Sequence, residues 1–310
     1  MIVGEGDYRF EWIDDWAVLP NTPSVRENGR THGVVVCKNG DVIVFCQADP
    51  AILIFSTDGL LKDSWGDRFL GAHGMTLVED DGVELLWLTD QDTGEVAKMT
   101  LAGETVLNLA KPEHEIYETR KYIPTWVAVN EERFGGNGDI WVADGYGSFF
   151  VHRYDKDGNY ISSISGEEGA GRFNCPHGLS TETRAGTPEL YVADRGNKRI
   201  QVYTMDGTFI RTFGSDYMTS PDGSSSYPGG GLLVPELFAR VTLLDENDEP
   251  ACLLGSNEAV CRIEGWPNHE PDLIEEGKFN SPHGAAADDQ GNIYVVEWII
   301  GGRITKLERV

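Results

Sequence analysis

The chain has 310 residues and carries 51 Asp and Glu against 25 Lys and Arg, which gives a formal net charge of −26 at pH 7. This charge argues against nucleic acids and anionic membranes as partners, because both are bound through basic surfaces that neutralise phosphate. The hydrophobic share of 40% is enough for a sizeable core, and 37 Gly with 14 Pro indicate many turns, so the composition is not that of a disordered chain.

The N-terminus favours a cytoplasmic location, and the cysteines do not predict a disulfide or zinc site. No apolar run approaches the ~20 residues of a membrane span, and the acidic start, MIVGEGDYRFEWIDDW, lacks the layout of a secretory signal. We therefore expect a cytoplasmic protein, or a secreted one if a signal has been removed. Five cysteines without a CxxC motif predict neither a disulfide framework nor a cysteine zinc site. Cys252 and Cys261 would face each other if residues 252–261 formed a hairpin, but two buried thiols are preferred.

The elements of the chain follow a repeat that begins at Thr31. One copy contains His-Gly, a short apolar strand, an Asn-Gly or Asp-Gly turn, an apolar strand ending in Asp, a third strand, Asp-Gly, and a fourth strand ending in Gly. Residues 176–214, PHGLSTETRAGTPELYVADRGNKRIQVYTMDGTFIRTFG, show this order clearly. Four strands joined by glycine turns are typical of a propeller blade. Further copies begin at Ala72, Pro124 and Pro282.

The intervals between the copies predict an all-β, six-bladed β-propeller that forms one domain over residues 1–310. The last two clear copies are separated by about twice the usual interval, so one degenerate blade must lie between them. Residues 237–266 supply that blade, and the polar residues 215–231 before it are predicted to form a long loop. The last copy stops after its third strand, so we expect residues 8–20 to add the outer strand and close the ring.

Four of the seven histidines share one repeat position, at the start of the first strand, and each is followed by Gly. They are His32, His73, His177 and His283. First strands line the central channel of a propeller, so these side chains are expected to face its axis. His73, His177 and His283 belong to alternate blades and are predicted to hold a divalent metal with an open coordination position, with His32 as a fourth ligand or a substrate-binding neighbour. Zinc is expected, with Mn, Fe or Ni as alternatives. The other histidines, His114, His152 and His269, are expected to be ordinary surface residues.

A second set of residues follows the second strand of each blade, near the predicted channel mouth. It comprises Gln47, Asp90, Asp144, Asp194 and Glu297, with Tyr146, Arg195 and Trp298 close behind. Carboxylates at this position either support a ligand histidine or accept backbone amides of the next turn, and the second role is preferred for Asp144 and Asp194. Arg195 could equally pair with a neighbouring carboxylate. We predict substrate contacts from Gln47, Asp90, Trp126 and Trp298.

The repeat as a whole resembles the NHL class of propeller. More narrowly, PTWVAV, ADGYGSFFVHRYDKDG, FNCPHGLS and ADRGNKRIQVY resemble peptidyl-α-hydroxyglycine α-amidating lyase, the lyase domain of the peptidylglycine α-amidating enzymes. The resemblance covers about residues 72–310 and includes AHGMTL and SPHGAAADDQGNIYV. It implies a zinc ion on His73, His177 and His283, a catalytic tyrosine at Tyr146 and an active-site arginine at Arg195.

Three departures from the family pattern affect the substrate and the metal ions that are expected. The family's other catalytic arginine, after the second strand of blade one, has no counterpart here, where Gln47 lies nearby. The family has no histidine at the position of His32. Its His-Asp pair for a structural calcium is His283-Gly284 in this chain, so a structural calcium is not favoured.

These residues predict a metal-dependent lyase that acts on a small hydroxy or carbonyl substrate. A bound metal lowers the pKa of a coordinated hydroxyl and polarises a carbonyl, Tyr146 could serve as general base or acid with a pKa lowered by the cation, and Arg195 could bind a carboxylate or an oxyanion. The set suits cleavage of a carbinolamine or hemiacetal, and also elimination or epimerisation. Two alternatives stay open, a non-enzymatic NHL propeller that binds protein and a calcium-dependent lactonase-type hydrolase. The sequence does not indicate an oligomeric state.

Overall fold

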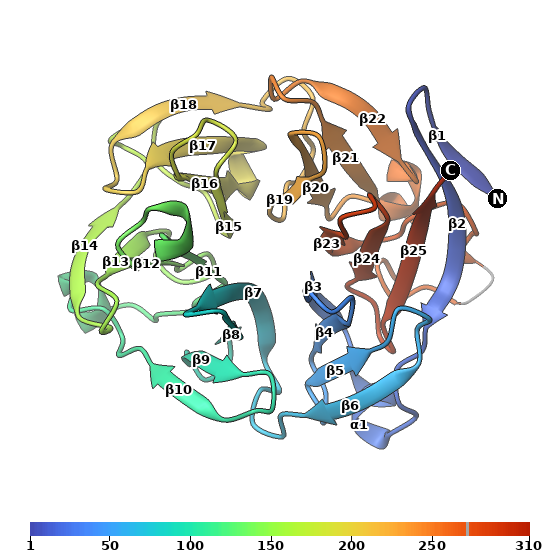
Figure 1. Ribbon diagram of the computed structural model, residues 1–310, viewed down its shortest axis with the longest axis horizontal. Helices are drawn as coiled ribbons and strands as arrows, with labels where there is room; N and C mark the ends of the chain where they lie inside the picture. Colours follow the sequence, from blue (N-terminus) through green and yellow to red (C-terminus); the bar gives the residue numbers. More distant parts are fainter. Residues whose placement is uncertain (271–272) are drawn as a thin grey trace. The chain divides into compact units, whose positions relative to one another are not determined.

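The regular structure is almost entirely antiparallel strand, because short apolar runs alternate with tight turns along the chain. The computed structural model describes residues 1–270 and 273–310. Its strands form six sheets, five of them with consecutive strand order and the sixth built from both ends of the chain, which confirms the predicted all-β, six-bladed β-propeller (Figure 1). The sheets belong to two compact units: a middle unit, residues 71–223, and a terminal unit, residues 1–70 with 224–310. Within the described residues, no helix has both the length and the apolar character needed to cross a membrane.

The middle unit contains blades two, three and four. Blade two has β7 (Ala72–Asp80), β8 (Val83–Asp90), β9 (Val96–Thr100) and β10 (Thr105–Asn108). Blade three has β11 (Trp126–Val129), β12 (Ile140–Ala143), β13 (Val151–Tyr154) and β14 (Tyr160–Ile164). Blade four has β15 (Pro176–Glu182), β16 (Glu189–Asp194), β17 (Arg199–Thr204) and β18 (Phe209–Phe213). Three short 3-10 helices lie in the connections, η1 (Glu115–Glu118), η2 (Glu132–Phe134) and η3 (Arg195–Asn197).

The terminal unit contains blades one, five and six. Blade one has β3 (Thr31–Val36), β4 (Val42–Cys46), β5 (Ile52–Phe55) and β6 (Leu61–Trp65), preceded by the helix α1 (Pro23–Glu27). Blade five has β19 (Ser225–Tyr227), β20 (Gly231–Glu236), β21 (Arg240–Leu244) and β22 (Pro250–Leu254), followed by the 3-10 helix η4 (Glu258–Arg262). Blade six combines β23 (Pro282–Ala287), β24 (Ile293–Glu297) and β25 (Arg303–Arg309) with β1 (Ile2–Glu5) and β2 (Tyr8–Ala17) from the other end of the chain.

The N-terminal segment supplies outer strands of blade six. Strand β2 pairs antiparallel with β25, with Phe10 opposite Arg309 and Trp12 opposite Leu307. Phe10 and Trp12 are buried in a core that also contains residues of blade five. Strand β2 therefore covers the edge of β25, and β1 becomes the outermost strand of this sheet.

Cores form between neighbouring blades within each unit, since each sheet presents one apolar face to the next. Trp141 of β12 packs with Leu190, Val192 and Tyr203 of blade four, and its indole Nε1 donates to the carbonyl of Met205 at 3.3 Å. A wide aromatic ring with one polar atom thus fills the space between two blades and keeps its N–H bonded.

The sequence prediction for blade five was partly wrong. Residues 225–227, placed in a loop, form the first strand β19. This strand is polar, and Ser225 Oγ donates to the carbonyl of Ala285 in blade six at 2.8 Å, so an apolar pattern could not reveal it. The suggested hairpin over residues 252–261 is also absent: Cys252 lies in β22, Cys261 lies in η4, and both thiols are free.

Candidate functional site

Each of the four repeat histidines lies at an irregular point in its first strand. In β7 the pairing with β8 skips from Ala72 to Met75, and in β15 the pairing with β16 skips from Pro176 to Leu179. The residues between them, which include His73 and His177, are out of register. Strands β3 and β23 skip His32 and His283 in the same way. Such bulges redirect a side chain out of the sheet. The middle unit brings His73 and His177 together, with ring centroids 4.7 Å apart, and the terminal unit brings His32 and His283 together at 4.3 Å.

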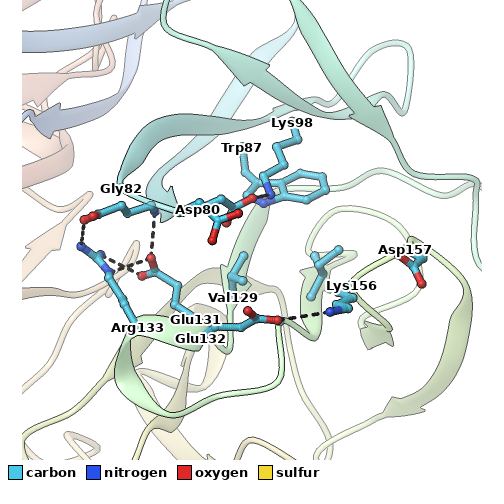
Figure 2. A pocket seen from close by; sticks show the side chains of 14 residues that line it. Asp80, Gly82, Trp87, Lys98, Val129, Glu131, Glu132, Arg133, Lys156 and Asp157 are labelled. Atoms are coloured by element: carbon cyan, nitrogen blue, oxygen red, sulfur yellow. Dashed lines mark hydrogen bonds and ion pairs between the residues drawn. The ribbon is translucent and has the colours of Figure 1, made fainter.

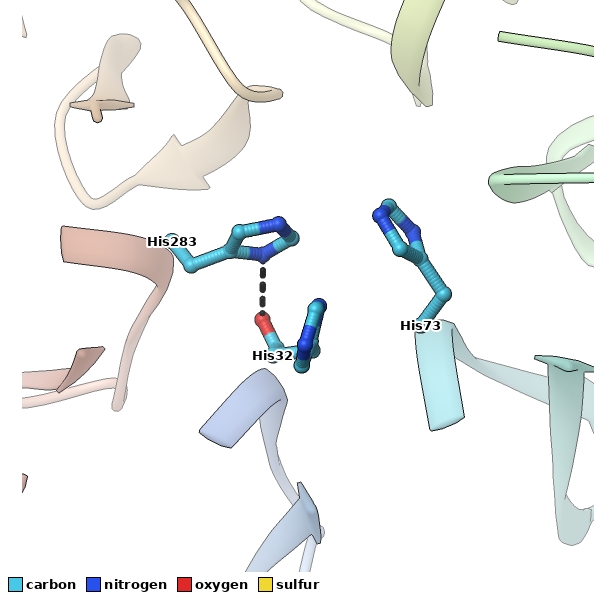
Figure 3. A group of neighbouring side chains, drawn as sticks. All are labelled: His32, His73 and His283. Carbon is cyan, nitrogen blue, oxygen red and sulfur yellow. Dashed lines mark hydrogen bonds between the residues drawn. The ribbon is translucent and has the colours of Figure 1, made fainter. Parts of the chain in front are cut away.

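Three of these histidines use Nδ1 in the same way. His73 Nδ1 lies 2.8 Å from the carbonyl oxygen of Thr125, and His177 Nδ1 lies 2.7 Å from that of Asp222. His283 Nδ1 lies 3.1 Å from the carbonyl oxygen of His32, and a dashed line marks this hydrogen bond in Figure 3. A carbonyl can only accept, so Nδ1 carries the proton and Nε2 has the lone pair. Burial lowers the pKa of His73 to about 3, which keeps its imidazole neutral.

The glycine after each histidine allows this contact. A Cβ on Gly74 would lie 2.2 Å from the carbonyl oxygen of Thr125, and a Cβ on Gly178 would lie 2.3 Å from that of Asp222. The backbones of neighbouring blades therefore approach too closely for any side chain. The same close approach brings the carbonyl oxygen within reach of the histidine.

We expect Gly178→Ala to lower the free energy of unfolding by about 1–3 kcal/mol, because the added methyl must displace the Asp222 backbone. Urea unfolding followed by tryptophan fluorescence measures the change. Gly223→Ala is the matched control, since a Cβ there would meet only the Gly178 Cα at an ordinary 3.7 Å. Equal stability of the two variants would contradict the close-approach explanation.

Tyr146 is the centre of the cluster in the middle unit. Its hydroxyl lies 3.1 Å from His73 Nε2 and 2.9 Å from His177 Nε2. Arg195 Nη2 donates to the same oxygen at 3.2 Å, and the guanidinium lies 5.3 Å from the ring centroid. Burial raises the pKa of Tyr146, and the positive charge of Arg195 acts in the opposite direction. One hydroxyl thus lies between two imidazole lone pairs and a cation.

Asp222 holds Arg195 in this cluster and was not singled out from the sequence. Its Oδ1 accepts from Arg195 Nη1 at 2.9 Å and lies 3.5 Å from His177 Nδ1. Burial lowers the pKa of Arg195, but the carboxylate of Asp222 more than compensates, and the pKa is raised overall. Residues 220–223 read SPDG, where two other copies read CPHG and SPHG, so Asp222 occupies the histidine position of blade five. This alignment is the feature of the sequence that could have identified Asp222.

The carboxylates after the second strands lie in turns. Asp90 is fully buried, and its oxygens accept from the backbone N–H groups of Gly71, Asp92 and Thr93 at 2.8–3.0 Å. Asp194 likewise accepts from the backbone of Asn174 at 2.8 Å and pairs with a neighbouring arginine. The structure therefore gives Asp90 and Asp194 the turn-supporting role.

The aromatic and amide residues predicted to bind substrate lie in different units. Trp126 begins β11 in the middle unit, where it is partly exposed and contacts Gly74. Gln47 and Trp298 belong to the terminal unit. The Trp298 ring centroid lies 5.4 Å from the guanidinium of Arg30. The backbone carbonyl of Arg30 accepts a hydrogen bond from the backbone N–H of Gln47 at 2.8 Å.

The expectation that His152 is a surface residue was wrong. It lies in β13 with no exposed surface, and Tyr117 and Ser163 contact its two ring nitrogens at 2.6 and 2.7 Å. His114 is half-buried and accepts from the backbone N–H of Ile116, at the start of η1. His152 was expected at the surface because Tyr117, which covers one of its ring nitrogens, comes from a connection outside blade three.

A polar cleft of about 440 Å³ lies at the opposite end of β7 from His73 (Figure 2). Most of its charged lining residues pair with one another, among them Arg133 with Glu79 at 3.0 Å, Lys98 with Asp80, and Lys156 with Glu132 at 3.3 Å. The ion pairs largely satisfy these groups, and the cleft shares no residue with the Tyr146 cluster. We therefore take the Tyr146 cluster, and not this cleft, as the candidate functional site.

Comparison with curated proteins identifies relatives over about three quarters of the chain. Human NHL repeat-containing protein 3 is 30% identical over 253 residues, covering 76% of this chain and 70% of the human protein. Peptidyl-glycine α-amidating monooxygenase B of Xenopus laevis is 27% identical over 248 residues, or 77% of this chain and 26% of that protein. Peptidyl-α-hydroxyglycine α-amidating lyase 1 of Drosophila melanogaster is 29% identical over 269 residues, or 77% and 45%. This chain thus spans about a quarter of the Xenopus protein and under half of the Drosophila one.

Solved structures share the fold at lower identity. Virginiamycin B lyase from Staphylococcus aureus has a TM-score of 0.63 at 16% identity and covers 97% of this chain and 100% of its own. A gluconolactonase from Xanthomonas campestris also has a TM-score of 0.63, at 13% identity, with 92% and 88% covered. At these identities the likeness concerns the fold alone. No protein-family profile matches the chain.

Proposed function

The chain belongs to the family of NHL repeat-containing proteins, and from this membership and the Tyr146 cluster we propose that it is a lyase for small hydroxy substrates. The relatives in Xenopus and Drosophila are named for α-amidation and for the α-hydroxyglycine lyase reaction. We propose a substrate of the same chemical class, a carbon that bears both a hydroxyl and an acylated nitrogen. The observation that carries the proposal is one tyrosine hydroxyl in contact with two histidines and an arginine.

The donor chemistry of the cluster fits a divalent metal ion. His73 and His177 are held by backbone carbonyls at Nδ1, which leaves both Nε2 atoms as acceptors directed at one oxygen. Neutral imidazoles supported in this way are common ligands of zinc and similar ions. We propose that these two Nε2 atoms hold the ion, which when bound would lower the pKa of a hydroxyl and polarise a carbonyl. Participation of His283 and His32 in the same ligand set stays a prediction from the repeat.

In the proposed reaction Tyr146 moves the proton. Burial disfavours its phenolate, while the positive charge of Arg195 and of a bound cation would favour it. The phenolate takes the proton of the substrate hydroxyl, the carbon–oxygen bond becomes a carbonyl, and the carbon–nitrogen bond breaks. The phenol then returns the proton to the leaving nitrogen, so the sum of the products equals the substrate. Arg195 stabilises the phenolate form through Nη2, and Asp222 holds the guanidinium in place through Nη1.

The direct test is incubation of purified protein, supplied with zinc, with an N-acyl-α-hydroxyglycine. We expect release of glyoxylate and the N-acyl amide in equal amounts, well above the spontaneous rate. Absence of any acceleration would contradict the lyase proposal. Hydrolysis of a sugar lactone without glyoxylate release would instead support the lactonase alternative.

A further inference from the structure

A chain of hydrogen bonds lies behind Tyr146, and we infer that Tyr117 is a positioning residue that holds Tyr146 and His73 in place through Asp144. Tyr117 comes from η1, in the connection between blades two and three. The change in kcat that this inference predicts rests on the proposed function, while the predicted change in the hydrogen bond from His73 to Thr125 does not.

The hydrogen-bond chain consists of four short contacts in blade three and η1. Tyr160 Oη lies 2.7 Å from Ser163 Oγ, which lies 2.7 Å from His152 Nδ1. His152 Nε2 lies 2.6 Å from Tyr117 Oη, which donates to Asp144 Oδ2 at 2.6 Å. Tyr117, Asp144 and His152 are all buried, so water does not compete for these bonds.

With an ionised Asp144, only one arrangement of protons gives every hydrogen bond from Tyr160 to Asp144 a donor and an acceptor. The carboxylate accepts, so Tyr117 gives it the phenolic proton and must accept from His152 Nε2. Nδ1 of this histidine then accepts from Ser163, which accepts from Tyr160. Burial lowers the pKa of His152 to about 3, so it stays neutral with a single N–H, as the arrangement requires.

Asp144 connects the chain to the candidate site on two sides. Its Oδ2 accepts from the backbone N–H of Ser148 at 2.6 Å, and residues 145–148 fold closely around the carboxylate with Tyr146 among them. Its Oδ1 accepts from the backbone N–H of Ile123 at 2.7 Å, two residues before Thr125, whose carbonyl fixes the His73 tautomer. One carboxylate therefore sets both the turn that presents Tyr146 and the segment that orients His73.

The Tyr117 hydroxyl makes the side-chain contact that keeps this carboxylate charged. Burial raises the pKa of Asp144 to about 6, and the hydrogen bond from Tyr117 is foremost among the contacts that lower it. Without that donor the carboxylate accepts the two amides less strongly, because it is less fully ionised. The turn around Tyr146 and the segment before Thr125 then lose their common anchor.

The test compares Tyr117→Phe with Tyr160→Phe in the full-length protein. Each change removes one phenolic hydroxyl from the same hydrogen-bond chain, next to Asp144 for Tyr117 and at the far end for Tyr160. We expect Tyr117→Phe to lower kcat for the α-hydroxyglycine substrate about tenfold with KM within about twofold, and Tyr160→Phe to change neither beyond about twofold. Equal losses in the two variants, or no loss in Tyr117→Phe, would overturn the inference.

A second measurement does not depend on turnover. The downfield proton NMR signal of His73 Nδ1–H, assigned by its absence in His73→Gln, reports the bond to Thr125. We expect Tyr117→Phe to shift or broaden it and Tyr160→Phe to leave it unchanged. An unchanged signal in both variants refutes the positioning role even if the wild-type chain shows no lyase activity. Should Tyr117→Phe fail to fold, His152→Gln replaces it, with an expected threefold loss of kcat and a shift of the same signal; an unaffected His152→Gln would count against the inference.

Discussion

Tyr146→Phe is expected to lower kcat for glyoxylate release by about 100- to 1,000-fold, because general acid–base catalysis contributes on this scale. The change removes the one oxygen that contacts His73, His177 and Arg195. The ring remains, so its edge contact with His73, at 5.0 Å between centroids, is kept and KM should stay within about threefold. Steady-state kinetics at saturating substrate measures the loss, and a hundredfold loss corresponds to about 2.7 kcal/mol of transition-state stabilisation.

Tyr154→Phe is the matched control for this prediction. Tyr154 is a buried tyrosine of blade three whose hydroxyl donates to the carbonyl of Ala110 at 3.1 Å, whereas the Tyr146 hydroxyl contacts His73, His177 and Arg195. We expect its loss to reduce the free energy of unfolding by about 1 kcal/mol and to leave kcat unchanged. A Tyr146→Phe variant with kcat near that of wild type would show that another group transfers the proton.

The fold could be predicted from the sequence because each blade repeats its own local signals. Glycine turns and apolar runs of strand length recur in order, so a single well-formed copy defines the others. Blade five departed from this rule, since β19 contains serines and tyrosine in place of an apolar run. Ser225 donates a hydrogen bond to blade six, and no pattern within the strand predicts this contact.

Residues of the candidate site could be predicted from the sequence only where they recur at one position of the repeat. The histidine position was visible because four copies carry the same residue, while the fifth copy carries Asp222 and was missed in a segment interpreted as a loop. The contacts of His152 could not be foreseen, because Tyr117 comes from a connection that has no counterpart in the repeat. Residues that support a site from outside the repeating strands become apparent only in three dimensions.

His177→Ala is expected to abolish retention of a stoichiometric metal ion. The imidazole supplies one of the two Nε2 atoms that converge on the Tyr146 oxygen, and a methyl group offers no lone pair in its place. Protein without a polyhistidine tag should be prepared without chelator, supplied with zinc, passed over a desalting column and analysed by inductively coupled plasma mass spectrometry. We expect about one zinc per wild-type chain and close to none for His177→Ala and His73→Ala.

His114→Ala serves as the control for metal loss, because His114 is a half-buried histidine whose Nδ1 accepts the backbone N–H of Ile116. It should retain the ion, which separates loss of a ligand from loss of any histidine. His283→Ala and His32→Ala in the same assay test whether the remaining repeat histidines join the ligand set. Full metal content in both His73→Ala and His177→Ala would refute the ligand assignment, and with it the role of the repeat position in holding an ion. If zinc-free wild-type protein still releases glyoxylate, Tyr146 and Arg195 remain the proposed catalytic pair, and the two imidazoles orient the phenol instead of binding an ion.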